Sequence, residues 1–115
     1  MTENQFRTIA LSMGDAVEGA HMGHPDFRAN GKIFATIHTG GKTGMVKLTP
    51  EQQQDFVKEA PKAFAPENGA WGRQGCTRVT LAFADAEVVG KAMTLAWQNA
   101  GKPKTKSIGK RTRRG

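Results

Sequence analysis

Apolar residues recur at helical spacing in three parts of the chain, and each part begins with residues that can cap a helix. Thr2 and Gln5 form a capping box, because the hydroxyl can accept from the Gln5 amide while the Gln5 side chain reaches back. Thr49 and Gln52 repeat this signal around a proline, and Asp85 can cap a third helix. The apolar positions behind these caps are Phe6, Ile9, Ala10 and Met13; Phe56, Val57 and Ala60; and Val88, Val89, Ala92, Met93, Ala96, Trp97 and Ala100. The residues predicted to end the three helices are Gly14, Pro61 and Gly101.

Between the first two predicted helices, apolar positions alternate with polar ones, which indicates strands. Residues 27–29 and 32–38 flank Asn30-Gly31, a dipeptide that strongly favours a tight hairpin because both residues tolerate a positive φ. A glycine-rich turn over 40–44 leads into a strand over 45–48, and residues 16–22 are a candidate for a further strand. Alternation returns over 77–83, after a connector (61–75) rich in proline and glycine.

The element order is helix, antiparallel meander, helix, strand, helix. It predicts an α+β fold in which an antiparallel sheet, a meander plus one later strand, packs against about three helices. The 115 residues suffice for a single domain, which we place at residues 1–100, followed by a tail over 101–115. A core of this size needs no disulfide, and the single cysteine, Cys76, forms none within the chain.

The net charge of +7 is confined to the tail. Residues 1–100 contain ten Lys or Arg and ten Asp or Glu, whereas residues 101–115 contain seven basic residues and no acidic one. A segment of this composition buries too little apolar surface to fold alone, so we expect the tail to be disordered in isolation. The charge split predicts that any affinity for polyanions resides mainly in the tail.

Five motifs follow one another along the chain. They are Gly23-His24-Pro25-Asp26-Phe27-Arg28, Gly31-Lys32-Ile33-Phe34-Ala35, Val46-Lys47-Leu48-Thr49-Pro50-Glu51-Gln52-Gln53, Asn68-Gly69-Ala70-Trp71-Gly72-Arg73-Gln74-Gly75 and Ala96-Trp97. In this order they resemble the MmcQ/YjbR family of small bacterial proteins, and the resemblance covers roughly residues 5–98. The resemblance implies a double-wing, frataxin-like α+β fold, in agreement with the periodicity, and a DNA-binding function inferred from the wing topology. Two features depart from the family pattern: Cys76, where a bulky aromatic residue is common, and the basic tail.

These observations predict a non-enzymatic protein that binds nucleic acid, DNA in the first place, without reading its sequence. Lysine and arginine release counterions when they neutralise phosphates, and such contacts position a protein without specifying a base. The predicted contacts in the tail are Lys102, Lys104, Lys106, Lys110, Arg111, Arg113 and Arg114. Two hairpin turns add Arg28, Lys32 and Lys42 as wing contacts, although lysines are also common in turns that only face solvent. Arg73 and Arg78 are further candidates for positioning contacts.

The alternative is a protein-interaction or small-ligand-binding module built on the glycine-rich segment 68–75. Trp71 and Arg73 would form its recognition surface. Trp71 could stack on a base, but a tryptophan in such a loop more often packs over the core and anchors the loop. Apolar recognition of this kind would survive high salt, whereas phosphate binding would not.

Three other patterns do not indicate catalysis or metal binding. Gly41-Lys42-Thr43 resembles the end of a phosphate loop, but Thr36 occupies the place of the required glycine and no helix follows. His21 and His24 are three apart, so in a single strand they would face opposite sides, and zinc needs three or four converging ligands. Cys76 has no base at a known spacing and is expected to be a packed thiol. We predict no cofactor.

The family's frataxin-like fold raises the question of iron binding, which would need an acidic ridge on the first helix. That helix offers only Glu3, so iron binding does not carry over. Neither a signal peptide nor a membrane span is visible in the sequence. A cytoplasmic location is therefore the expectation.

Overall fold

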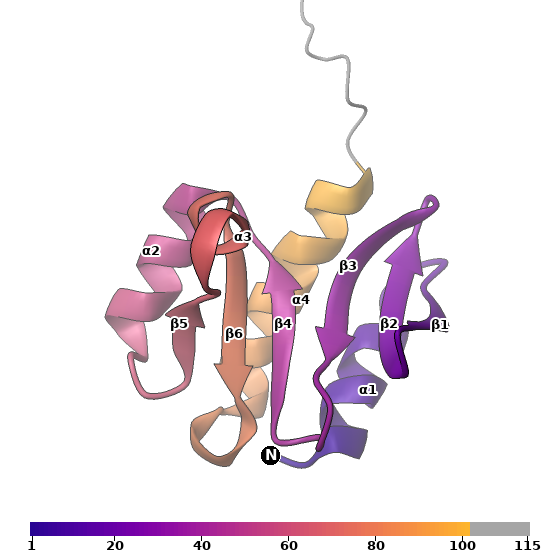
Figure 1. Cartoon of the computed structure of the whole chain (residues 1–115), viewed down its shortest axis with the longest axis horizontal. Coiled ribbons are helices and arrows are strands. Elements are labelled where there is room, and N and C mark those ends of the chain that lie inside the picture. Colours follow the sequence, from indigo (N-terminus) through magenta and orange to yellow (C-terminus); the bar gives the residue numbers. More distant parts are fainter. Residues whose placement is uncertain (102–115) are drawn as a thin grey trace, which may run out of the picture.

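The strands predicted by the alternation join into one antiparallel sheet in the computed structural model, which describes residues 1–101 (Figure 1). The strands are β1 (Val17–His21), β2 (His24–Ala29), β3 (Lys32–Ile37), β4 (Thr43–Lys47), β5 (Phe64–Pro66) and β6 (Cys76–Thr80). They are hydrogen-bonded in the order β1-β2-β3-β4-β6-β5. The predicted meander with a later strand is confirmed, and residues 16–22 supply its first strand. The tail beyond residue 101 lies outside the described residues.

Four helices accompany the sheet within the described chain: α1 (Glu3–Leu11), α2 (Pro50–Glu59), α3 (Gly69–Arg73) and α4 (Ala86–Gly101). The three predicted caps are present: Thr2 and Thr49 each close a capping box, and the Asp85 carboxylate accepts from the first-turn amides of α4. α4 packs against α1 and crosses one face of the sheet, behind β3 and β4 in Figure 1. The core between them contains the fully buried Phe6, Phe27, Phe34, Ile37 and Met93. None of the helices in residues 1–101 has the length and apolar content needed to cross a membrane.

The structure corrects two of the predicted element boundaries. The connector over 61–75 is not irregular throughout, since it contains β5 and the five-residue α3, which makes four helices where about three were predicted. The strand predicted over 77–83 ends at Thr80, and a 3₁₀ turn (Leu81–Phe83) follows. The Leu81 amide still donates to the Lys42 carbonyl at 3.1 Å, and the Ala84 amide then donates to the Leu81 carbonyl at 3.1 Å, which closes the turn. In a strand, Leu81 and Phe83 would face the same side of the sheet. In the turn, Leu81 is buried and Phe83 is 62% exposed, so the alternating apolar residues of the sequence do not form a strand here.

A bulge in β3 decides which side chains face the helices. Phe27 pairs with Ala35 and Arg28 pairs with Ile33, so Phe34 is an extra residue in β3 with no partner in β2. Phe34 and Ala35 therefore both enter the core, where each is fully buried. Ile33, before these two residues, and Thr36, after them, lie on the opposite face of the sheet.

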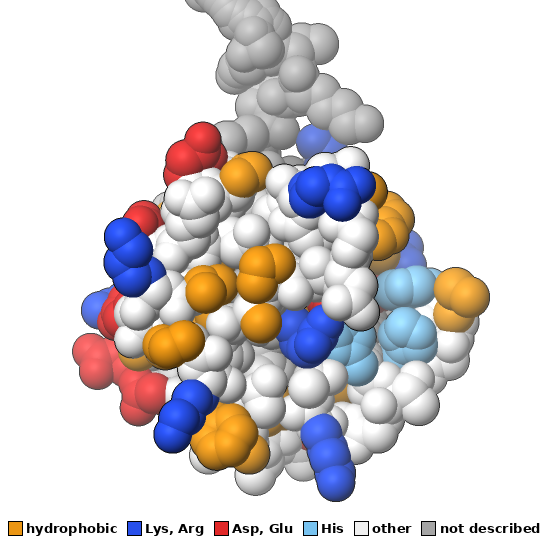
Figure 2. Space-filling model, turned by 60° about the vertical axis from the view of Figure 1, so that its left-hand side comes forward, with side chains coloured by type: hydrophobic (Ala, Val, Ile, Leu, Met, Phe, Trp, Pro, Cys, Tyr) orange, Lys and Arg blue, Asp and Glu red, His pale blue; other side chains and the backbone are white. Residues whose placement is uncertain are grey.

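This opposite face of the sheet carries no long helix; only α3 and the segment before it lie over one part of it (Figure 1). The register places Thr36 next to Met45 and Lys47 next to Cys76 on this open face. Histidine side chains lie close together on one side of the molecule, next to hydrophobic ones (Figure 2). A face that is part apolar, part polar and not covered by a helix is the natural place to search for a binding site.

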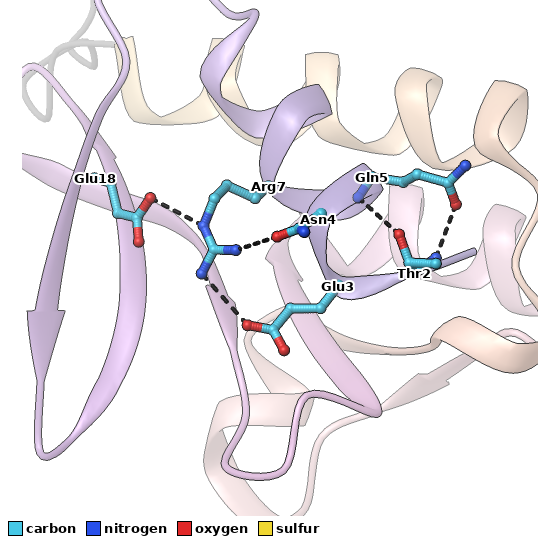
Figure 3. A network of polar contacts seen from close by, with 6 residues as sticks. All are labelled: Thr2, Glu3, Asn4, Gln5, Arg7 and Glu18. Atoms are coloured by element: carbon cyan, nitrogen blue, oxygen red, sulfur yellow. Dashed lines mark hydrogen bonds and ion pairs between the residues drawn. The ribbon is translucent and has the colours of Figure 1, made fainter.

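Side-chain contacts at two places hold α1 to the rest of the molecule. In the middle of the helix, Arg7 donates to Glu18 of β1 at 3.1 Å and to Asn4 of the first turn at 2.9 Å (Figure 3). After its last turn, the Gly14 carbonyl accepts from the indole nitrogen of Trp97 at 2.8 Å. Trp97, predicted as a core residue, is therefore half-buried, packing its ring against the core while its nitrogen reaches the surface.

Candidate ligand and nucleic-acid site

The open sheet face contains a pocket of about 420 Å³. Ile33 and Thr36 of β3 and Met45 of β4, the two central strands of the sheet, form its floor. The other residues that line it are His21, His24, His38, Lys47, Glu67, Asn68, Trp71 and Cys76. An apolar floor with a few polar groups around it is the usual composition of a small-ligand site, and the volume lies in the usual range.

Asp26 organises the β1–β2 side of this pocket. Its carboxylate is completely buried, and it accepts two hydrogen bonds from the Arg28 guanidinium at 2.8 and 3.0 Å and lies 2.7 Å from His21 Nδ1. The Arg28 hydrogen bond lowers the pKa of Asp26 most, burial works in the opposite direction, and His21 adds to the lowering. Asp26 is therefore a carboxylate that stays ionised and orients its two neighbours.

His24 contributes an unsatisfied polar atom to the same side of the pocket. Its ring centroid lies 5.0 Å from that of His21, because the two residues pair across the β1–β2 turn. The sequence argument that placed these histidines on opposite faces is wrong, since the turn lies between them. His24 Nδ1 is buried and forms no hydrogen bond with any described residue. A ligand in the pocket could supply the missing partner.

A second histidine–carboxylate–arginine group flanks the pocket on its β5–β6 side. Glu67 lies 3.0 Å from His38 Nε2 and 3.2 Å from Arg78 Nε. The other ring nitrogen of His38 is hydrogen-bonded to the Thr43 hydroxyl at 2.7 Å. Both ring nitrogens of His38 are thus engaged, which fixes the ring at the wall of the pocket.

The glycine-rich segment places Trp71 at the rim of the pocket. A Cβ on Gly72 would lie 1.7 Å from the Glu67 carbonyl oxygen, and one on Gly75 would lie 1.9 Å from that of Leu48. Close backbone packing therefore needs glycine at both positions. Trp71 itself is 64% exposed, so the expectation that it packs over the core is wrong. Arg73 is exposed on the same helix and does not line the pocket.

Gln53 of α2 holds this segment in place, and the sequence analysis did not single it out. Its side chain is buried, and its amide nitrogen lies 3.0 Å from the carbonyl oxygens of Gly72 and Cys76 and 3.2 Å from the Thr77 hydroxyl. The signal was a polar residue on the apolar side of a predicted helix, one turn before Phe56. Gln53 thereby joins α3, β6 and α2 into one rigid support for Trp71.

Cys76 lies in the wall of the pocket and is buried and unpaired. Burial raises the pKa of its thiol, and the nearby Lys47 lowers it by a smaller amount. A thiol with a raised pKa is a poor nucleophile at neutral pH. The prediction of a packed thiol is confirmed.

The predicted basic contacts separate into two places. Arg28 and Lys32 lie at the β2–β3 turn, while Lys42 lies at the β3–β4 turn, and successive turns of a meander occupy opposite ends of the sheet (Figure 1). The two hairpin turns therefore do not form one continuous basic surface. Arg28 is also committed to the buried Asp26 carboxylate, which raises the pKa of its guanidinium.

A second pocket, of about 460 Å³, lies beside the β2–β3 turn. Arg28, Lys32 and Lys47 line it together with the last turn of α4. Gly101, the last described residue, lies against Asn30, since a Cβ built on it would be 3.3 Å from the Asn30 amide nitrogen. The seven basic residues predicted to contact phosphates lie outside the described residues, and the segment that carries them begins at this cationic pocket. In the part of the chain that the structure describes, no three His, Cys, Asp or Glu side chains are grouped as metal ligands.

The chain is an α+β protein whose six-stranded sheet keeps α1 and α4 on one face and a pocket, with the short α3 at its rim, on the other. The family model YjbR matches residues 11–99, and the chain belongs to the YjbR family. Two crystal structures share the fold. One is a Deinococcus radiodurans protein with a DUF419 domain (TM-score 0.71, 17% identity, 90% of this chain and 83% of that chain covered). The other is a Pseudomonas syringae protein (TM-score 0.70, 18% identity, 87% and 99% covered). A search of curated proteins finds no significant match.

Proposed function

We propose that this YjbR-family protein binds nucleic acid, and DNA in particular, without catalysing a reaction. The observation that carries the proposal is the position of the basic segment. Seven positive charges without an acidic residue follow Gly101, and Gly101 lies beside the pocket lined by Arg28, Lys32 and Lys47. Phosphates held by the tail would thus meet further cations on the folded domain.

The charge balance argues that the tail provides most of the affinity. The folded part has equal numbers of basic and acidic residues, so its long-range field does not attract a polyanion. Arg28 must also share its guanidinium with Asp26. Contacts of this kind neutralise phosphates and carry no sequence information, so we expect binding that is not sequence-specific.

Two features of the described residues favour binding over catalysis. The two carboxylates at the pocket, Asp26 and Glu67, are each paired with an arginine and a histidine. Burial raises the pKa of the Cys76 thiol beside them. The Cys76 thiol, the one potential nucleophile among these groups, is therefore kept in its protonated and less reactive form. The proposal includes a cytoplasmic location, which suits a free thiol.

A second candidate function is the binding of a small ligand, and one observation favours it. Trp71 is 64% exposed at the rim of a largely apolar pocket. An indole beside an apolar pocket offers a flat apolar surface and an N–H donor to a ligand that enters the pocket. This function would not depend on the basic tail.

The test is the binding of fluorescently labelled duplex and single-stranded DNA, followed by anisotropy at about 50 and 200 mM salt. The full-length chain is compared with a chain that ends at Gly101. A Lys58→Gln, Lys62→Gln variant, which removes two exposed cations away from both pockets, is the matched control. We expect the full-length chain and the control to lose roughly a thousandfold in affinity between the two salt concentrations, and the shortened chain to bind weakly at both. Binding that does not change when residues 102–115 are removed would contradict the role of the tail.

A further inference from the structure

We propose that the pocket on the open sheet face holds one unstacked nucleobase of a single-stranded nucleic acid, with Trp71 stacked on it at the rim. The inference rests on the proposed function and gives it a preferred partner. It assigns the pocket to the base and the neighbouring cations to the backbone phosphates.

The composition of the pocket matches a base. Ile33 and Met45 give an apolar floor for the flat side of a heteroaromatic ring, and the exposed Trp71 offers a second flat surface at the rim. Stacking between aromatic side chains and bases adds to the phosphate contacts in single-strand binding, and it tolerates any base. The edge of a base also carries hydrogen-bond donors and acceptors.

Polar groups for that edge are present around the pocket. His24 Nδ1 is the one buried side-chain nitrogen or oxygen of the described residues that has no hydrogen-bond partner, and His24 lines the pocket. Asn68 adds an amide at the rim. The carboxylates, in contrast, already bind arginines, so the pocket presents little free negative charge to a nucleotide.

Lys47 and Ile33 line both pockets, so the two pockets are neighbours at these residues. A base in the first pocket therefore has its sugar and phosphate next to Lys47, and the following phosphates run toward Arg28 and Lys32. Gly101, which precedes the basic segment in the sequence, lies next to Asn30 of the β2–β3 turn. The surface thus changes from apolar in the first pocket to cationic in the second, as a nucleotide changes from its base to its phosphate.

The pocket favours a single strand over a duplex. In a duplex each base is stacked on its neighbours and paired, so none can enter a pocket unless it is first unpaired and extruded from the stack, which costs free energy. In a single strand the bases are accessible. Duplex binding should then depend on the tail and the cations alone.

The test compares three labelled probes of equal length: a single strand, the same strand without bases (an abasic phosphodiester), and a duplex. The variant is Trp71→Ala, and Phe83→Ala is the matched control, because Phe83 is an equally exposed aromatic residue, 62% against 64%, outside the pocket. We expect the full-length chain to bind the single strand more tightly than the abasic strand. Trp71→Ala should lower the affinity for the single strand roughly five- to a hundredfold and leave the other two probes unchanged. Trp71→Phe should retain most of the affinity.

Three results would overturn the inference, and each has a separate meaning. Equal affinity for the single and abasic strands, or equal effects of Trp71→Ala and Phe83→Ala, would leave the phosphate-binding function standing without a base pocket. Binding of none of the probes would reject the proposed function itself. Competition by a free mononucleotide as strong as that by the strand would assign the pocket to a soluble nucleotide.

Discussion

Asp26 shows how a single residue can determine the shape of a site without taking part in its chemistry. The carboxylate is buried between β1 and β2, and its ion pair with Arg28 and its contact with His21 keep it charged there. A buried charge without partners would be strongly unfavourable, so each of these neighbours is held in place by the need to satisfy it. The arrangement aligns His21 and His24 across the hairpin.

The first prediction concerns the pH dependence of this interaction. The folded-state pKa of Asp26 lies below its ordinary value of 3.8, so the stabilisation is fully present above that pH and is lost as the pH falls toward the lowered value. Asp26→Asn should reduce the free energy of unfolding by about 1–3 kcal/mol at neutral pH. The difference from the wild-type chain should shrink in acid.

Urea unfolding at a series of pH values measures this difference. Asp55→Asn is the control, because Asp55 is an exposed carboxylate on α2 with no ion pair among the described residues. A loss of stability in Asp26→Asn that persists unchanged in acid would show that side-chain packing, and not the charge of Asp26, is responsible.

Among the elements, α3 depends most on close backbone packing. Its Gly72 lies so near the Glu67 carbonyl that a methyl group cannot be accommodated without moving the backbone. Gly72→Ala should therefore destabilise the fold by about 3 kcal/mol. Gly90→Ala in α4 is the matched control, since nothing lies within 4 Å of its added Cβ, and it should stabilise by about 0.5–1 kcal/mol.

Thermal unfolding measures both effects: Tm should fall in Gly72→Ala and rise in Gly90→Ala. A Gly72→Ala variant with unchanged stability would show that the segment carrying Trp71 can relax freely. That result would also weaken the view of Trp71 as a rigidly presented side chain, because the same backbone contact holds α3 above the sheet.

The elements that the sequence predicts correctly are those specified by neighbouring residues. The capping boxes at Thr2 and Thr49 and the Asn30-Gly31 turn each depend on a few adjacent residues, and all are present. β5 and α3 were missed because they depend on long-range contacts. The Glu67 amide donates to the Cys76 carbonyl, and Gln53 reaches α3 from another helix. No local pattern over 61–75 contains this information.

For the whole molecule, the pocket could not be predicted because it forms only when distant segments meet. His21, His38 and Trp71 come from the first hairpin, the end of β3 and the short α3, and only the sheet order brings them together. Charge, in contrast, is visible in the sequence, so the basic tail was an obvious candidate. The Trp71 segment was weighed as a ligand loop, but the bulge that turns Ile33 toward it leaves no signature in the sequence.

The last prediction separates the two parts of the proposed nucleic-acid site by their response to salt. Phosphate contacts release counterions, so the logarithm of affinity falls with the logarithm of salt concentration by roughly 0.7 per contact on a single strand. Stacking on Trp71 releases none. Trp71→Ala should therefore lower the affinity by the same factor at every salt concentration and leave the slope unchanged, whereas removal of residues 102–115 should flatten the slope.

Lys47 lines both pockets, so its substitution should affect both the salt dependence and the binding of a single strand. Lys47→Gln should reduce the slope by about one contact and weaken single-strand binding. Lys91→Gln is the control, because it neutralises an exposed lysine of α4 outside both pockets. Its slope should stay within about half a contact of that of the unmodified chain. Anisotropy titrations of the unmodified chain and its four variants on one single-stranded probe, over a fourfold range of salt, give all the slopes. A changed slope in Trp71→Ala would mean that the indole acts by positioning cations, and the division of the site into base and phosphate parts would then be wrong.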